Sequence, residues 1–194
     1  MRLKHITFQE TDREPWIASQ RQWLAASVAA GGLRGAFGAE HEGQARVLFL
    51  WESDEALRGF MEHDHHRALA EAGTVGRYAA LYLDVLEQEG SLVGATYVAE
   101  SLAWVRDDGI DDWLVERKIW AEATRACDGF VGSLVARGRH ACLVTTLWRD
   151  RAAHEGYLHD VVPQIRMKTD EGSTVRLVRF AAELLPMLTH GAIS

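Results

Sequence analysis

The chain contains an internal repeat, which is clearest in VLFLWESDEALRGFM at residues 47–61 and VTTLWRDRAAHEGYL at residues 144–158. These stretches lie 97 positions apart, half of the 194-residue chain, and the register continues beyond them without gaps. Tryptophan is rare, yet three pairs coincide at this offset: Trp16 and Trp113, Trp23 and Trp120, Trp51 and Trp148. Similarity at a fixed period indicates duplication of one structural unit. The chain is therefore predicted to be a tandem repeat.

The two repeats are expected to span residues 1–88 and 97–188. Between them, residues 88–96 read QEGSLVGAT. Small and turn-forming residues of this kind suit a linker between two packed units.

Each repeat shows the same order of secondary-structure signals. Period-two alternation predicts strands, apolar residues at helical spacing predict an amphipathic helix, and near-continuous apolar runs predict strands covered on both faces. Ser53 and Asp150 are the expected N-caps of a second helix in each repeat. The expected elements are strands 3–9 and 98–105, helices 14–30 and 111–127, strands 33–39 and 130–136, strands 47–51 and 143–148, and strands 78–86 and 175–183.

This order is βαββαβ twice, the split βαβ arrangement of ferredoxin-like domains. The sheet face away from the helices needs a cover, and a second unit can supply it. The predicted fold is therefore α+β, with two tandem ferredoxin-like units packed sheet to sheet as a pseudo-dimeric α+β barrel. A compact monomer follows from that arrangement, and a homodimer of whole chains stays open.

The chain resembles the dimeric α+β-barrel superfamily, in particular its antibiotic-biosynthesis-monooxygenase-like branch, as a fused repeat. The resemblance covers nearly the whole chain in layout. Its most specific stretch is the strand-to-helix segment Leu50-Trp51-x-Ser53-x-Glu55-Ala56-Leu57, followed by His66. Most members of that superfamily carry one unit per chain and pair as homodimers.

The resemblance implies a small-molecule-binding barrel with cofactor-independent oxygenase-like chemistry on an aromatic or quinone-type metabolite. Similar proteins include oxygenases of polyketides and quinols as well as haem-degrading enzymes. Both of these types use a pocket asparagine, and this sequence contains none. Neither catalytic set transfers residue by residue, so no cofactor is predicted, and bound haem is left as a minor alternative.

Composition excludes several classes of function. The formal net charge of -7 argues against nucleic-acid partners, and no apolar stretch is long enough to span a membrane. Met1–Gln9 does not resemble an export signal, and Cys127 and Cys142 are too few for a disulfide framework. A cytoplasmic location is expected on these grounds.

The clearest difference between the repeats is Glu62-His63-Asp64-His65-His66, which faces His159-Asp160-Val161-Val162-Pro163. On a helical wheel Asp64 falls near the centre of the apolar face, where its counterpart is Val161. One interpretation makes Asp64 and a neighbouring histidine, with His66 as a candidate, an acid–base pair or part of a metal site. The other ends the helix near His63 and lets Asp64 cap a new turn, with the histidines solvated. A zinc site is disfavoured because His-x-His-His on one helix does not converge without further ligands, and no metal is predicted.

A second candidate site comes from strand faces, which have a period of two. The first and last strands of a ferredoxin-like sheet are neighbours, so we expect His5 near Tyr82 and Glu100 near Arg179. This face is expected to point away from the helices and to suit a flat aromatic ligand. The alternative is a set of frayed, wet strand ends. The expected lining is His5, Tyr78, Tyr82, Glu100, Trp104 and Arg179.

Three functions remain open from the sequence. The first is a ligand-binding barrel with oxygenase-like activity. The second is a non-catalytic carrier of a ligand or of haem, with His63, His65 or His66 pointing inward. The third is a structural or interaction module whose interior is packed core.

Overall fold

The computed structural model describes residues 1–9, 12–72, 77–91, 93–169 and 174–191, which form two compact units. Unit 1 comprises Met1–Val85 together with Leu184–Ile193, and unit 2 comprises Leu86–Glu183. The fold is α+β, and its described strands join in the hydrogen-bonded order β8-β5-β7-β6-β4-β1-β3-β2-β9. Strand β4 belongs to both units because its last residues lie beyond Val85.

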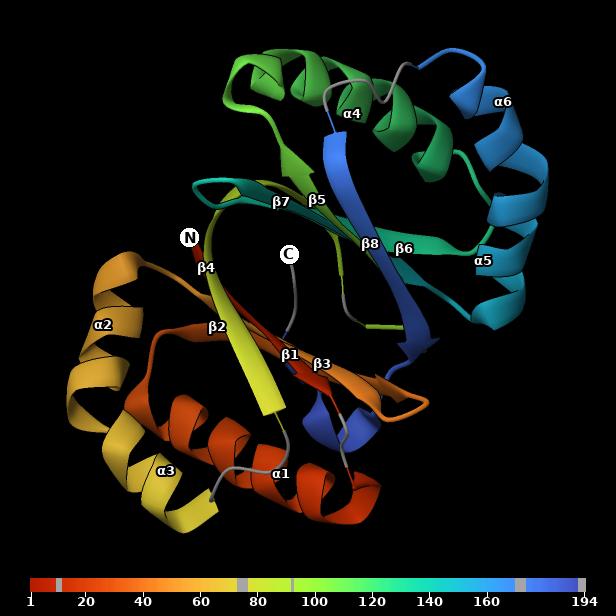
Figure 1. Cartoon of the computed structure of the whole chain (residues 1–194). Helices are drawn as coiled ribbons and strands as arrows, with labels where there is room; N and C mark the ends of the chain where they lie inside the picture. Colours follow the sequence, from red (N-terminus) through yellow and green to blue (C-terminus); the bar gives the residue numbers. More distant parts are fainter. Residues whose placement is uncertain (10–11, 73–76, 92, 170–173, 192–194) are drawn as a thin grey trace. The chain divides into compact units, whose positions relative to one another are not determined.

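Unit 1 is a ferredoxin-like βαββαβ unit in which the second helical segment is divided in two (Figure 1). Its strands pair antiparallel in the order β4-β1-β3-β2, and β9 adds to the edge of β2. The elements are β1 (Arg2–Gln9), α1 (Arg13–Ala30), β2 (Leu33–His41), β3 (Gln44–Trp51), α2 (Asp54–His63), α3 (His65–Ala72), β4 (Arg77–Gly90), η4 (Pro186–Leu188) and β9 (His190–Gly191).

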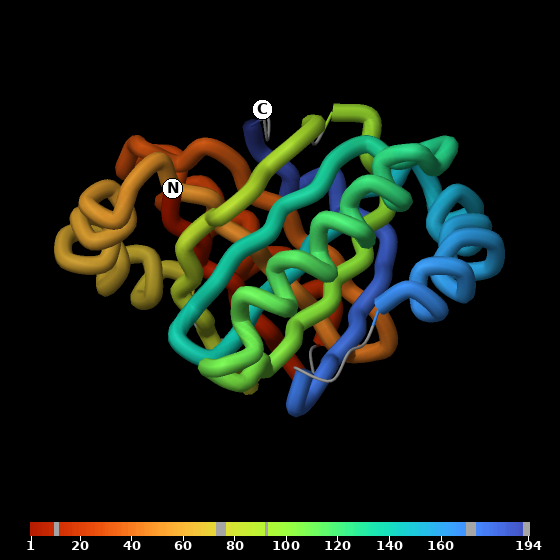
Figure 2. Tube along the Cα trace, turned by 90° about the horizontal axis from the view of Figure 1, so that it is seen from above, coloured from red at the N-terminus to blue at the C-terminus, as the bar shows by residue number. Residues whose placement is uncertain are grey.

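Unit 2 repeats the same order, with its four strands paired as β8-β5-β7-β6. Helix α4 lies over the sheet of this unit (Figure 2). The elements are β5 (Tyr97–Val105), η1 (Asp107–Gly109), α4 (Ile110–Arg125), β6 (Phe130–Arg137), β7 (Ala141–Trp148), α5 (Arg151–Gly156), η2 (Tyr157–Val161), α6 (Val162–Arg166) and β8 (Thr174–Glu183).

Matching capping interactions start the second helices, as the sequence predicts. The Ser53 hydroxyl accepts a hydrogen bond from the Ala56 N–H at 3.1 Å, and the Asp150 carboxylate accepts one from the Ala153 N–H at 2.8 Å. Each acceptor satisfies an N–H group that has no partner within its helix. Helix α1 ends at Ala30 and is followed by Gly31, whose φ of 81° favours glycine.

The second helical segment is interrupted at the same place in both units, by different means. In unit 1, α2 ends at His63 and α3 begins at His65, with Asp64 between them. In unit 2 the segment stays helical but passes through η2, a π-helical turn that ends at Val161, the counterpart of Asp64. Such turns widen a helix and change the direction of its side chains.

The core of unit 1 lies between its sheet and α1, α2 and α3, which cover one sheet face (Figure 1). Trp16 is fully buried and meets the Phe8 ring edge-on at 5.7 Å, while Trp51 stacks on Phe60 at 5.2 Å. Aromatic pairs of this geometry add about 0.5–1.5 kcal/mol beyond the area they bury. They hold the helices against the sheet and frame the cavity described next.

Candidate functional site

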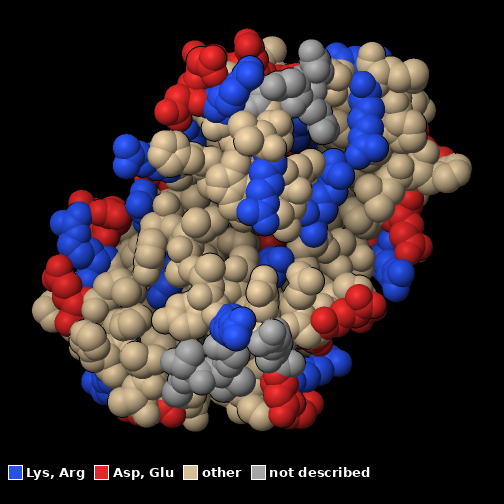
Figure 3. All heavy atoms as spheres, in the orientation of Figure 1, with Lys and Arg blue, Asp and Glu red and all other residues tan. Residues whose placement is uncertain are grey.

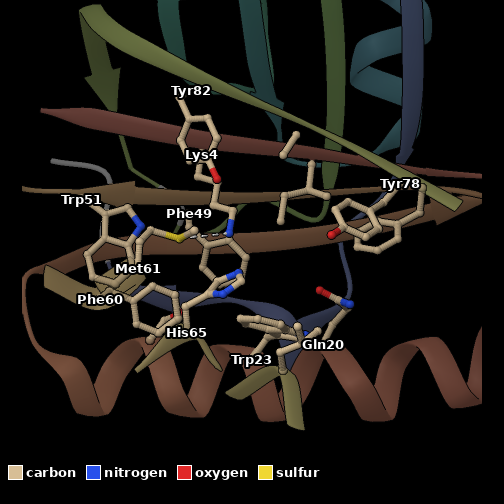
Figure 4. A pocket seen from close by; sticks show the side chains of 15 residues that line it. Lys4, Gln20, Trp23, Phe49, Trp51, Phe60, Met61, His65, Tyr78 and Tyr82 are labelled. Atoms are coloured by element: carbon tan, nitrogen blue, oxygen red, sulfur yellow. Dashed lines mark hydrogen bonds between the residues drawn. The ribbon is translucent and has the colours of Figure 1, made fainter. Parts of the chain in front are cut away.

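A cavity of about 260 Å³ opens between the sheet of unit 1 and its helices (Figure 4). Side chains from β1, β3 and β4 form one wall, and side chains from α1, α2 and α3 form the other. Its lining is mostly aromatic and aliphatic: Lys4, Ile6, Phe8, Gln20, Trp23, Ser27, Phe49, Trp51, Phe60, Met61, His65, Leu69, Tyr78, Ala80 and Tyr82. A cavity with apolar walls and few polar groups is typical of a small-molecule site.

The lysine in this cavity is the unusual feature. Only 7% of Lys4 is exposed, and burial lowers the pKa of its amine to about 8. The Nζ atom lies 3.7 Å from the Met61 sulfur, 5.7 Å from the centre of the Trp23 ring and 5.9 Å from that of Tyr82. Aromatic faces attract the ammonium, whereas desolvation favours the neutral amine. Near neutral pH, both protonation states of Lys4 are therefore accessible.

The second polar group is the indole N–H of Trp51 on β3. Trp51 is 1% exposed, and its Nε1 has no hydrogen-bond acceptor among the described residues. Its counterpart in unit 2, Trp148, donates to the Thr146 hydroxyl at 2.9 Å, but the residue equivalent to Thr146 in unit 1 is Phe49. A buried donor without an acceptor is costly, so this N–H favours a ligand that brings one.

His65 and Gln20 are two further polar residues of the lining. His65, at the start of α3, packs 5.1 Å from the Trp23 ring, and desolvation followed by the charge of Lys4 lowers the pKa of its imidazole. Its neutral ring is therefore favoured beside the lysine. Gln20 is buried on α1 and presents its amide to the cavity (Figure 4).

The tyrosines of β4 lie on the cavity side of the sheet, contrary to the sequence-based prediction. In the strand register, Tyr82 pairs with Lys4 and Tyr78 pairs with Phe8, whereas His5 pairs with Leu81. The expected grouping of His5 with Tyr78 and Tyr82 on one face is therefore wrong. His5 is only 1% exposed and lies on the face away from α1. Burial raises the pKa of the Tyr82 phenol.

The same inversion occurs in unit 2. Arg179 pairs with Ser101, and Glu100 pairs with Phe180, so Glu100 and Arg179 extend from opposite faces of the sheet instead of the same one. Trp104 pairs with Arg176, whose guanidinium lies 5.0 Å from its ring centre. Both final strands carry apolar and aromatic residues on each face, so period-two alternation alone could not choose between the faces.

Asp64 lies at the break between two helices that one of the two interpretations expects. It lies between α2 and α3, its backbone carbonyl accepts from the Ala68 N–H at 2.9 Å, and its carboxylate pairs with Arg67. His66 is exposed. Of the clustered histidines, His65 is the one that lines the cavity. Within the described ranges, no three His, Cys, Asp or Glu side chains are placed to hold a metal ion.

Sequence reasoning missed Lys4, Gln20 and Trp51. A signal for Lys4 was present: it stands in a strand between Leu3 and Ile6, and its counterpart in the second repeat is Ser101. Comparison of the repeats at position 4 would have shown a cation that only one unit carries. The sequence could not show whether the Trp51 N–H has a hydrogen-bond acceptor, because that depends on which neighbouring side chain reaches the indole.

Solved structures similar to this chain have the same fold. A candidate monooxygenase from Fusobacterium nucleatum superposes with a TM-score of 0.77 at 13% identity, covering 98% of this chain and 94% of its own. An anthrone oxidase-like protein gives a TM-score of 0.67 at 13% identity, with coverages of 97% and 92%. A Listeria monocytogenes ferredoxin-fold protein related to antibiotic biosynthesis monooxygenases gives 0.56 at 15% identity, with coverages of 95% and 96%.

This chain has the same ferredoxin-like fold as these structures. The predicted ferredoxin-like architecture is thereby confirmed. No protein-family model and no curated protein sequence matches the chain. At 13–15% identity the likeness establishes the fold and leaves the chemistry to the residues of the site. Among the described residues, no helix is long and apolar enough to cross a membrane.

Proposed function

We propose that unit 1 binds a small planar phenol or quinol in the Lys4 cavity and oxidises it with dioxygen, without a cofactor. The observation that carries this proposal is the buried Lys4 amine, whose pKa is about 8, in a cavity with aromatic walls. A flat aromatic molecule matches those walls, and an acidic hydroxyl gives Lys4 a partner.

The residues of the cavity suit formation of an aromatic oxyanion. Neutral Lys4 accepts the proton of the bound hydroxyl, and the resulting ammonium then faces the oxyanion. The Trp51 N–H is a second donor for that oxygen, since no described residue accepts from it. Donors placed where charge develops stabilise it more strongly in a site that excludes water. The deprotonated ring is electron-rich and can pass an electron to dioxygen.

An anthrone-type substrate, whose enol (anthranol) tautomer carries the hydroxyl that Lys4 deprotonates, gives a balanced reaction. The substrate methylene and one dioxygen become a carbonyl and one water. The two C–H bonds of the methylene break, one oxygen atom becomes the oxygen of the new carbonyl, and the other leaves as water. The substrate supplies both electrons that reduce the second oxygen atom, so no external reductant is needed. Likeness to the anthrone oxidase-like protein supports this substrate class at the level of the fold.

Haem fits the cavity poorly. The cavity volume of about 260 Å³ lies below the roughly 300–1,000 Å³ of ordinary drug-sized sites. The ring of His65 is packed against Trp23. His63 and His66 are exposed. The proposed reaction therefore uses no haem. A non-catalytic carrier of the same aromatic ligand is the second candidate, because the aromatic walls and the two donors favour binding whether or not chemistry follows.

The test is oxidation of anthrone, followed by oxygen uptake and by formation of anthraquinone. We expect turnover above the enzyme-free rate, with one dioxygen consumed per anthraquinone, and a loss of at least tenfold in Lys4→Met. Lys118→Met is the matched control, because Lys118 is exposed on α4 outside the cavity. Binding without oxygen uptake would favour the carrier. Equal rates in Lys4→Met and native protein would contradict the role of Lys4.

A further inference from the structure

Unit 2 holds its own cavity, of about 470 Å³, between its sheet and α4, α5 and α6. At the 97-residue offset, most of its lining corresponds to the lining of the unit 1 cavity, so the two occupy equivalent places in the repeat. Equivalent pairs are Lys4 and Ser101, Gln20 and Arg117, Trp23 and Trp120, Ser27 and Thr124, Phe60 and Tyr157, Leu69 and Arg166, and Tyr82 and Arg179.

The charge of this second cavity differs from that of the first. The buried lysine is replaced by Ser101, while three uncharged positions become Arg117, Arg166 and Arg179. The one carboxylate among the described lining residues is Glu100. Formal charge in the lining is therefore positive, in a chain whose net charge is -7.

The arginines come from three different elements and surround the cavity. Arg117 on α4 is half-buried, with its guanidinium 5.2 Å from the ring centres of both Trp113 and Trp120. Arg166 at the end of α6 and Arg179 on β8 are exposed at the edge. Figure 3 shows Lys and Arg side chains on the face of unit 2 along which β8 runs. A guanidinium held by ring stacking loses little freedom when it binds an anion.

The walls of this cavity are aromatic as well. Tyr157 comes from the π-helical turn η2, and burial raises the pKa of its phenol. His154 is buried beside Tyr157 and Trp148, and desolvation lowers the pKa of its imidazole, which favours the neutral ring. The positive charge therefore comes from the guanidinium groups, while the rings provide flat apolar surface.

We propose that the cavity of unit 2 is a second ligand site, distinct from the Lys4 cavity, that binds an aromatic carboxylate. The ring packs between Trp120 and Tyr157, and the carboxylate pairs with Arg166 and Arg179. Planar carboxylates match the fork of donors on arginine, which a single ammonium cannot reproduce. The duplicated chain thus carries one cavity for a phenol and one for an acid.

The experiment compares 2-naphthoate with its neutral analogue 2-naphthamide by calorimetry. Titrations use the Lys4→Met protein, so that the cation of unit 1 is absent. We expect 2-naphthoate to bind at least tenfold more tightly than 2-naphthamide, and to lose that advantage in the Arg166→Gln/Arg179→Gln variant. The affinity for 2-naphthamide stays the same, because the aromatic walls are intact. Arg139→Gln is the matched control, an exposed arginine outside the cavity lining.

The place at which 2-naphthoate binds is tested separately by NMR, from the indole N–H signal of Trp120. The Trp120→Phe variant assigns that signal. We expect 2-naphthoate to shift this signal and 1-naphthol, the probe of unit 1, to leave it unchanged. Equal affinity for acid and amide, an unchanged 2-naphthoate affinity in the double variant, or absence of binding at millimolar concentration would overturn the second site. Each outcome leaves the anthrone test of unit 1 standing, so the two proposals fail independently.

Discussion

Trp148 donates its indole N–H to the hydroxyl of Thr146 at 2.9 Å. Trp51, its counterpart in the first repeat, has Phe49 at the position of that hydroxyl and no acceptor among the described residues. One exchange of threonine for phenylalanine therefore leaves a buried donor at the cavity of unit 1. In unit 2 the same donor is part of the fold.

Phenylalanine at these two positions is expected to have opposite effects. Both substitutions lose the packing of the larger ring. Trp51→Phe removes a donor without an acceptor, so it costs no more stability than this packing loss, while the affinity for 1-naphthol falls roughly fivefold. Trp148→Phe also breaks the bond to Thr146 and lowers stability by about 1 kcal/mol more, without changing that affinity. Urea unfolding measures the stability of both variants, and calorimetry measures their affinity for 1-naphthol. A stability loss confined to Trp51→Phe would show that its N–H is already paired.

Replacement of Lys4 is expected to stabilise the protein at neutral pH. The pKa of about 8 in the folded protein lies below the ordinary lysine value of 10.5, so desolvation destabilises the protonated form by up to about 3 kcal/mol. Between about pH 8 and 10.5 the folded protein has released a proton that the unfolded chain retains, and native stability rises with pH. The gain in unfolding free energy from Lys4→Met should therefore be largest below pH 8 and should vanish by pH 10.5. A difference that does not change with pH would contradict this.

Anthrone oxidation should depend on pH through the same amine. As a proton acceptor Lys4 must be neutral, so the enzyme-dependent rate should rise with pH and level off above a midpoint near 8. Enzyme-free oxidation is subtracted at each pH. In Lys4→Met the remaining rate should lose this midpoint. A midpoint that persists in the variant would assign the titration to another group.

Asp64 and His66 should be dispensable for activity. The Asp64 carboxylate pairs with Arg67 at the surface between α2 and α3, and exposed pairs contribute about 0–1 kcal/mol. Asp64→Asn and His66→Gln should therefore keep the native rate of anthrone oxidation, with less than about 1 kcal/mol lost in urea unfolding. A tenfold fall in the rate of anthrone oxidation at unchanged stability would instead support the interpretation of this pair as an acid and a base.

The repeat made the order of elements predictable, because two copies of each signal confirmed one another. The Ser53 and Asp150 caps follow from local chemistry and were found from sequence. The sequence did not show which face of each final strand points toward the helices. Strand β4 presents Tyr78 and Tyr82 on one side and Leu81 and Leu83 on the other. Both sets are large and largely apolar, so alternation fits either orientation.

The site was harder to predict than the fold because its decisive property is burial of a charged group. Lysine is almost never fully buried without a partner, so Lys4 reads as an exposed residue of an edge or surface strand. Only the packing of the helices against β1 shows that the Lys4 side chain is buried. Histidines attract attention in a sequence, and of the cluster at 63–66 only His65 faces the cavity.

Direct titration of Lys4 tests the central claim. The chain has three lysines, Lys4, Lys118 and Lys168, so ¹³C-labelled lysine gives few signals, and Lys4→Met assigns the one of interest. We expect the Lys4 signal to titrate near pH 8, and its midpoint to rise when 1-naphthol is bound, because an aromatic oxyanion favours the ammonium. A Lys4 midpoint near 10.4, or one that saturating 1-naphthol leaves unchanged, would contradict the Lys4 cavity as the ligand site.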